Sequence, residues 1–130
     1  MTLEPEIVQQ KIADYYRHLS NFELEPWLAC MTPDAEIYDP VGSPPLLPSQ
    51  DGAKFMGFLT QIYAKFEITL GEIFVAGNAA AVQWEMTVTG RNGRSTKAQG
   101  IGTFTITEDG RFSRTASYWD DQALKAALRE

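Results

Sequence analysis

The chain has 130 residues, of which 44% are hydrophobic and 22% charged, and its net charge is −6. This length fits one domain over residues 1–130, and the acidic balance argues against nucleic acid or an anionic membrane surface as a partner. Cys30 is the only cysteine, so an intrachain disulfide is impossible and a cytoplasmic location is expected. No apolar run approaches the ~20 residues of a membrane span.

The first half of the chain has the apolar spacing of helices that pack on one side. In the first segment, apolar side chains follow the i, i+4, i+7, i+11 pattern of one helix face. That face is formed by Val8, Ile12, Tyr15 and Leu19. Helices are predicted over residues 4–20, 21–31 and 50–66. A short strand is predicted over residues 35–38, between the last two helices.

The second half has the pattern of an antiparallel meander that is followed by a short terminal helix. Strands are predicted over residues 67–76, 79–90, 94–107 and 111–119. Asn92-Gly93 and Asp109-Gly110 lie between strands and are typical of tight hairpin turns, because they suit a positive φ. Apolar and polar residues alternate in the second strand, so one face of the sheet should pack on the helices. Helices followed by a twisted sheet predict an α+β domain.

One carboxylate is unusual in the loop after the short predicted strand. Asp39 follows apolar residues and precedes Pro40, which favours an extended backbone at Asp39. No lysine or arginine lies between Arg17 and Lys54 in the sequence. A carboxylate between apolar segments is costly unless it is paired or used, and a partly desolvated carboxylate suits a general base. The alternative is a loop aspartate that caps its own turn before proline.

Small residues follow one another on one face of the strand over residues 94–107. Ala98, Gly100 and Gly102 share this face with Phe104 and Ile106, which mark it as the inner face. Glycine weakens a strand, so the small residues need a reason. One interpretation is a cavity beneath bulky neighbours, namely Trp84, Met86 and Phe55. The other interpretation is a bulge, or a helix that packs very closely on the strand.

A loop motif and the order of elements resemble a known family. The motif is Asp-Ala-x-x-x-Asp-Pro-x-Gly-x-Pro-Pro from Asp34 to Pro45, and the last strand ends in Ala-Ser-Tyr-Trp at residues 116–119. With the preceding helix and its tyrosine, this resembles the ketosteroid isomerase branch of the NTF2-like, or SnoaL-like, superfamily. The resemblance implies a cone-shaped fold in which a curved, mostly antiparallel sheet and N-terminal helices enclose a deep pocket. It also implies a homodimer through the sheet and no cofactor.

The resemblance implies roles for individual residues. The family's general base falls on Asp39, and the tyrosine that stabilises the enolate oxygen falls on Tyr15. Helix geometry also favours Tyr15, because Tyr16 lies at the edge of the apolar face; the alternative is that Tyr15 is a core tyrosine. The family's second oxygen-binding donor falls on Gly102, where this chain has no side chain.

These observations predict a protein that binds a small hydrophobic molecule. The residues expected to contact it are Trp119, Trp84, Met86, Phe55, Phe104 and Gly102. The first functional hypothesis is an isomerase-like enzyme that moves a proton with Asp39 and Tyr15. The alternatives are a binding protein without catalysis, or another activity of this superfamily such as a dehydratase or cyclase. No metal site is expected, because His18 is the only histidine and has no ligand partners at suitable spacing.

Overall fold

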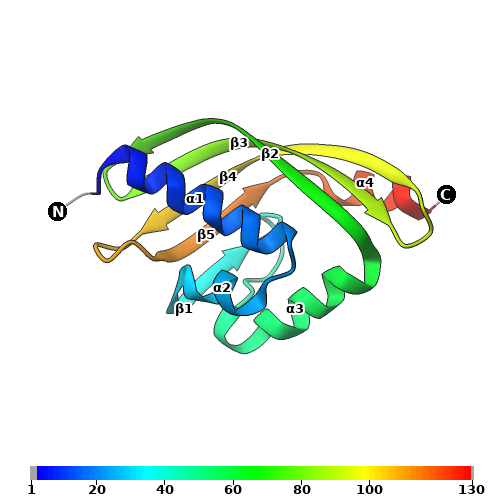
Figure 1. Ribbon diagram of the computed structural model, residues 1–130, viewed down its shortest axis with the longest axis horizontal. Coiled ribbons are helices and arrows are strands. Elements are labelled where there is room, and N and C mark those ends of the chain that lie inside the picture. Colours follow the sequence, from blue (N-terminus) through cyan, green and yellow to red (C-terminus); the bar gives the residue numbers. More distant parts are fainter. Residues whose placement is uncertain (1–2, 130) are drawn as a thin grey trace.

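A computed structural model describes residues 3–129 (Figure 1). The helices and strands, in chain order, are α1 (Pro5–Ser20), α2 (Leu24–Ala29), β1 (Met31–Tyr38), α3 (Pro48–Ile62), β2 (Tyr63–Ala76), β3 (Ala79–Gly90), β4 (Ser95–Ile106), β5 (Phe112–Tyr118) and α4 (Asp121–Arg129). The α+β prediction is therefore confirmed. None of the helices within the described range is long and apolar enough to cross a membrane.

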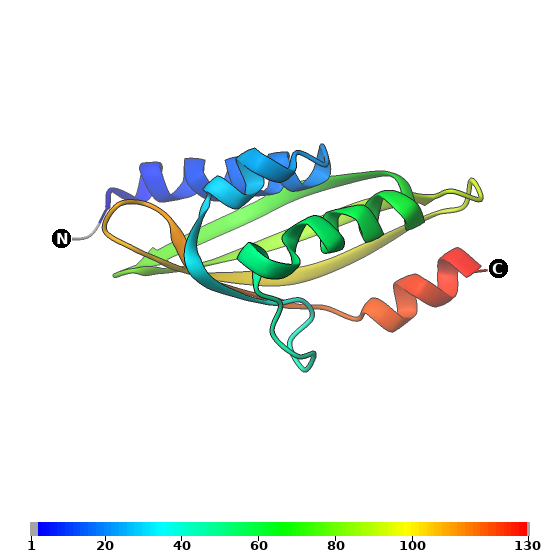
Figure 2. The same cartoon turned by 90° about the horizontal axis from the view of Figure 1, so that it is seen from below.

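The five strands form one curved sheet in the order β1-β5-β4-β3-β2. β1 runs parallel to β5, and every other neighbouring pair is antiparallel. Figure 2 shows α1 and α2 over one face of the sheet and α4 beyond the end of β5. The predicted alternation in β3 holds, because Ala80, Val82, Trp84, Met86 and Val88 are all buried.

The hydrophobic core lies between α1, α2 and the inner face of the sheet. Its most deeply buried large side chains come from every one of these layers and include Val8, Ile12, Trp27, Val82, Val88 and Phe112. The predicted hairpin turns are present, and Gly93 and Gly110 both adopt a positive φ, at 86° and 85°. Glycine adopts this conformation without the steric penalty of a side chain.

Several boundaries differ from the sequence-based predictions, and the second helix covers Leu24–Ala29 and not residues 21–31. α3 ends at Ile62, so the expected helix over residues 50–66 is too long, and β2 begins at Tyr63. Tyr63 and Phe66 are three residues apart, which fits a helix face, but here the pairing of β2 with β3 shifts register between Tyr63 and Lys65. This irregularity lets both rings face the core from a strand. β1 also begins earlier than expected, at Met31.

Candidate functional site

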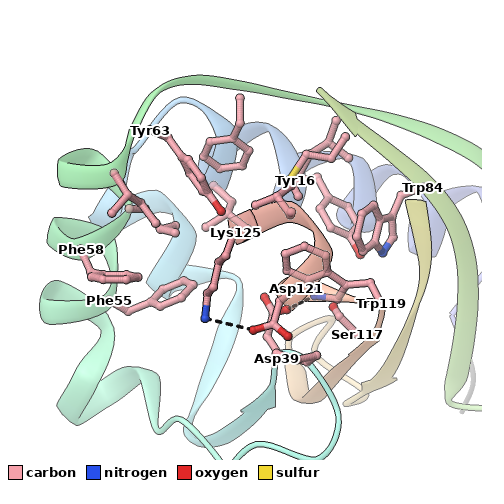
Figure 3. Close-up of a pocket in the computed structure, with 18 residues that line it drawn as sticks. Tyr16, Asp39, Phe55, Phe58, Tyr63, Trp84, Ser117, Trp119, Asp121 and Lys125 are labelled. Atoms are coloured by element: carbon pink, nitrogen blue, oxygen red, sulfur yellow. Dashed lines mark hydrogen bonds and ion pairs between the residues drawn. The ribbon is translucent and has the colours of Figure 1, made fainter. Parts of the chain in front are cut away.

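A pocket of about 150 Å³ opens between the inner face of the sheet, α1, α3 and α4. Its walls are mostly apolar and include Leu19, Phe55, Leu59, Phe66, Met86 and Leu124. Besides the tryptophans, its polar residues are few, and Figure 3 shows them around one space: two tyrosines, two aspartates, one serine and one lysine. Apolar walls with a small number of converging polar groups are the usual composition of a site for a small organic molecule.

Asp39 enters this pocket from the end of β1. The parallel register of β1 and β5 pairs Tyr38 with Ala116, which brings the residue after β1 beside the end of β5. There the Trp119 Nε1 donates a hydrogen bond of 2.7 Å to Asp39 Oδ1. The peptide bond between Asp39 and Pro40 is cis. Among the described residues, no hydrogen bond reaches the other carboxylate oxygen, so Asp39 Oδ2 is available to a ligand.

The surroundings of Asp39 favour its protonated form. Burial of the carboxylate among apolar side chains raises the pKa of Asp39 above its usual value, and the negative charge of Asp121 raises it further. The hydrogen bond from Trp119 acts in the opposite direction. The Asp39 residue is nevertheless exposed to solvent at the pocket mouth, which limits the size of the shift but leaves its direction. A carboxylate of this kind is more basic than one in water.

A second carboxylate comes from the terminal helix. Asp120 caps α4 by accepting a hydrogen bond from the Ala123 backbone N–H at 3.0 Å. Asp121, however, lines the pocket and forms an ion pair of 3.2 Å with Lys125 one turn later. Figure 3 shows the Asp121 carboxylate beside that of Asp39. The two carboxylates therefore differ, because only Asp121 has a cationic partner.

Of the two adjacent tyrosines of α1, Tyr16 lines the pocket and Tyr15 does not. Tyr15 lies in the core, where its ring makes edge contacts with Phe104 at 5.5 Å and Phe112 at 5.7 Å. Tyr15 is central on the apolar face of α1, as predicted, and for that reason it points into the core. Tyr16 lies at the edge of this face and reaches the pocket beside it. The structure thus places Tyr16, and not the predicted Tyr15, at this pocket.

The Tyr16 hydroxyl rests directly against the α-carbon of Gly102. A Cβ atom at position 102 would overlap the Tyr16 oxygen, so the space of a side chain on β4 is filled by a hydroxyl from α1. At Gly100, a Cβ atom would stand 2.7 Å from Trp84 Cζ2 and 2.9 Å from Trp119 Cβ. The prediction of a closely packed helix therefore holds at Gly102, where the neighbour comes from α1, whereas at Gly100 the neighbours are two tryptophans and the Tyr118 backbone oxygen of β5. Neither glycine borders an empty space.

Burial keeps the Tyr16 hydroxyl protonated. The pKa of Tyr16 is raised well above its usual value, first by burial and then by the nearby Tyr15 and Asp39. Tyr63 also lines the pocket, and burial together with the charges of Asp39 and Asp121 raises its pKa to about 12. Both hydroxyls are therefore hydrogen-bond donors at neutral pH, and neither titrates there.

The structure brings together most, but not all, of the residues predicted to contact a ligand. Asp39, Trp119, Trp84, Met86 and Phe55 line the pocket. Phe104 and Gly102 do not, since both lie behind the Tyr16 ring, which is 5.8 Å from the ring of Phe104.

Sequence reasoning missed five polar residues of the pocket, namely Tyr16, Tyr63, Ser117, Asp121 and Lys125. An edge position on an amphipathic helix was a signal for Tyr16, and an i, i+4 Asp–Lys pair marked Asp121 and Lys125. No sequence signal identified Tyr63, because its exposure to the pocket depends on the irregular start of β2. Within residues 3–129, no group of three or more His, Cys, Asp or Glu side chains is placed to hold a metal ion.

Comparison with solved structures identifies the architecture as the NTF2-like fold. An NTF2-like protein of unknown function from Burkholderia pseudomallei K96243 has a TM-score of 0.82 and 18% identity, covering 95% of this chain and 98% of that one. SalBIII, an epoxide hydrolase/cyclase-like enzyme with a role in pyran ring formation in the polyether salinomycin, has a TM-score of 0.80 and 19% identity, covering 92% and 95%. An LEH-like epoxide hydrolase from M. tuberculosis has a TM-score of 0.77 and 18% identity, covering 95% and 91%.

At these identities, the structural likenesses establish the fold and nothing further about activity. A comparison with curated protein sequences finds no match. The sequence pattern of the SnoaL-like domain matches residues 12–115, which is well over half of the chain. The matched segment begins in α1 and ends in β5, so it includes the strands and helices that carry most of the pocket. The chain belongs to the SnoaL-like domain family.

Proposed function

We propose that this protein is an acid–base enzyme in which Asp39 removes a proton beside the carbonyl group of a small, mostly apolar molecule. The observation that carries the proposal is the position of the Asp39 carboxylate. It stands in an apolar pocket, is fixed through one oxygen by Trp119 at 2.7 Å, and has its other oxygen available. A base must be held in place and be partly desolvated, and this carboxylate meets both conditions.

In this proposal the Tyr16 hydroxyl stabilises the negative charge that forms. As Asp39 takes the proton, the electron pair of the C–H bond moves toward the carbonyl oxygen and produces an enolate. A hydroxyl whose pKa is raised by burial stays protonated and donates a hydrogen bond to that oxygen. Asp39, now protonated, can return the proton to another carbon, which is isomerisation as in the ketosteroid isomerase branch. The enolate carbon can instead attack a second carbonyl of the same molecule, which closes a ring and leaves an alkoxide on that carbonyl oxygen. The alkoxide then takes the proton that Asp39 holds.

The size of the pocket supports a substrate of about one ring. A cavity of about 150 Å³ resembles an engineered protein cavity of roughly 150 Å³ that holds benzene. A steroid with four fused rings requires much more space. We therefore infer a smaller substrate than that of the ketosteroid isomerases.

The experiment uses a one-ring probe. Cyclohex-3-enone becomes the conjugated cyclohex-2-enone when a base moves one proton, and the conjugation is followed by ultraviolet absorbance. Asp39→Asn keeps an oxygen that accepts from Trp119 but removes the base, so the rate should fall about 10²- to 10⁴-fold. Asp34→Asn is the matched control, because Asp34 is an exposed residue of β1 outside the pocket.

Two results would contradict the proposal. One is full activity in Asp39→Asn. The other is a wild-type protein that binds the probe without converting either this probe or its epoxide counterpart. The second result would favour the alternative of a binding protein that uses the same pocket without catalysis.

The pair of carboxylates favours a second candidate function, the opening of an epoxide. That reaction needs one group to protonate the epoxide oxygen and another to activate the attacking water or hydroxyl. Asp39, whose pKa is raised, and Asp121, which is paired with Lys125 at 3.2 Å, are different enough to divide these tasks. SalBIII and the M. tuberculosis protein are named for chemistry of this kind.

The two candidates are separated by Asp121→Asn. This variant should lose hydrolysis of cyclohexene oxide if both carboxylates take part in epoxide opening. It should retain isomerisation of cyclohex-3-enone if Asp39 acts alone as the base. Parallel assays of both probes with Asp39→Asn and Asp121→Asn therefore assign the chemistry.

A further inference from the structure

Two tyrosine hydroxyls enter the pocket from different walls. Tyr16 comes from α1, and Tyr63 comes from the first position of β2. Figure 3 shows them on separate sides of the space that Asp39 also faces. The mechanism proposed above uses the Tyr16 hydroxyl and has no role for that of Tyr63.

The Tyr63 side chain is buried and unpartnered. Only 7% of the residue's surface is exposed, and among residues 3–129 its hydroxyl forms no hydrogen bond. Asp39 and Asp121 are near enough to act on it electrostatically, yet neither accepts its proton in a hydrogen bond. The Tyr63 oxygen is not among the buried unpartnered side-chain atoms of the described residues, which are Trp27 Nε1 and Trp84 Nε1, so it is reachable from the pocket. It can therefore donate a hydrogen bond to an acceptor oxygen that a ligand supplies.

The position of Tyr63 is fixed by the fold. The ring packs against Phe66 with centroids 5.7 Å apart, and the backbone changes there from α3 to β2. The contact with Phe66 on one side of the ring limits the rotation of the Tyr63 side chain. The hydroxyl is therefore a fixed part of the pocket surface, like that of Tyr16 against Gly102.

We propose that the Tyr63 hydroxyl is a second oxygen-binding donor, so that the pocket selects flat, ring-sized molecules that carry oxygen atoms at two separate positions. Tyr16 binds one oxygen, Tyr63 binds the other, and the apolar walls hold the carbon body between them. This inference rests on the proposed function in one respect. A molecule with two carbonyl oxygens can carry a C–H group between them, and that group is the most acidic type for Asp39 to deprotonate. The selection for two oxygens is a property of binding.

The test compares ligands that differ by one hydroxyl. Benzene-1,3-diol is paired with 3-methylphenol, and benzene-1,4-diol is paired with 4-methylphenol, because each pair has nearly the same shape. Dissociation constants are measured by calorimetry for the wild type, for Tyr63→Phe and for Tyr118→Phe. Tyr118 is the control, since it is half exposed on β5 and lies outside the pocket.

The expected result is that at least one diol binds the wild type roughly 3- to 10-fold more tightly than its methyl partner, as one neutral hydrogen bond provides. Tyr63→Phe should abolish this preference while leaving the affinity for the methylphenols unchanged, and Tyr118→Phe should retain it. The inference is overturned if neither diol is preferred, or if Tyr63→Phe keeps the preference. A failure of the proposed function is distinguishable, because it would abolish turnover of the ketone probe and leave this binding difference in place.

Discussion

Replacing Gly102 by alanine tests whether the close contact between β4 and the Tyr16 hydroxyl positions a functional group. The added Cβ atom would overlap the Tyr16 oxygen, while its distances to Phe104 Cε2 and Val82 Cγ1, 3.4 and 3.6 Å, are ordinary contacts. The hydroxyl must therefore move by roughly an ångström to restore normal separation. Tyr16 is only 7% exposed, and its ring contacts those of Tyr15 and Phe104, so these neighbours resist the movement.

The overlap gives two expected magnitudes. Overpacking of a buried site costs about 1–3 kcal/mol in the free energy of unfolding. Misplacement of an oxygen-binding group by about 1 Å can lower turnover by about 10²-fold. Both effects are measured on Gly102→Ala, the first by urea denaturation and the second with the cyclohex-3-enone assay. Gly57→Ala is the matched control, because no atom lies within 4 Å of its added Cβ.

A double substitution makes the reasoning refutable. In the Tyr16→Phe background the oxygen is absent, so Gly102→Ala should cause little or no further loss of stability. The coupling between the two substitutions should then equal most of the cost of Gly102→Ala alone. If Gly102→Ala destabilises the protein equally in both backgrounds, the hydroxyl contact is not the reason for glycine at this position. If it destabilises but leaves turnover unchanged, Tyr16 has no part in the reaction.

Two further predictions concern the base and the outer face of the sheet. Because the pKa of Asp39 is raised in the folded state, its ionisation opposes folding as pH rises above the ordinary value of 3.8. Below that pH, Asp39→Asn and the wild type should have the same melting temperature, and near neutrality the variant should have the higher one. If the difference in melting temperature becomes smaller as pH rises, the direction of the pKa shift of Asp39 is contradicted. The expected homodimer remains a prediction: Phe74, Ile101 and Tyr118 are exposed, and the register of β2, β3, β4 and β5 places them on the face away from the helices. Ile101→Glu should halve the mass measured by light scattering. A wild-type protein that is already a monomer in this measurement would contradict the homodimer.

Local signals predicted most of the fold. The hairpin dipeptides at Asn92-Gly93 and Asp109-Gly110 and the alternation in β3 depend on nearby residues, and both appear in the structure. The end of α3 was not predictable, since Leu59, Ile62, Tyr63 and Phe66 continue a helical spacing. The helix ends at Ile62 because the residues from Tyr63 onward pair with β3 as strand β2, with a register shift at the start of this pairing. This pairing is a tertiary interaction, which helical spacing does not reveal.

The candidate site could be predicted in part for a similar reason. Asp39 was identifiable from its own loop, because proline and apolar neighbours define its environment locally. The choice between Tyr15 and Tyr16 required the tertiary structure, since both are buried and the position of each on the face of α1 does not show on which side of that face the pocket lies. Lys125 and Asp121 belong to a short helix whose position depends on where β5 directs the chain.

The parallel pairing of β1 with β5 has a consequence for how the protein becomes active. Asp39 and its hydrogen-bond partner Trp119 are separated by 80 positions in the sequence, with α3 and the rest of the sheet between them. Contacts between distant parts of a chain form slowly, because a long loop must first be closed. The hairpins β2-β3 and β3-β4 can form early without creating the site. Recovery of catalysis during refolding should accordingly follow the slowest phase, and a partly folded chain with a native-like meander should be inert.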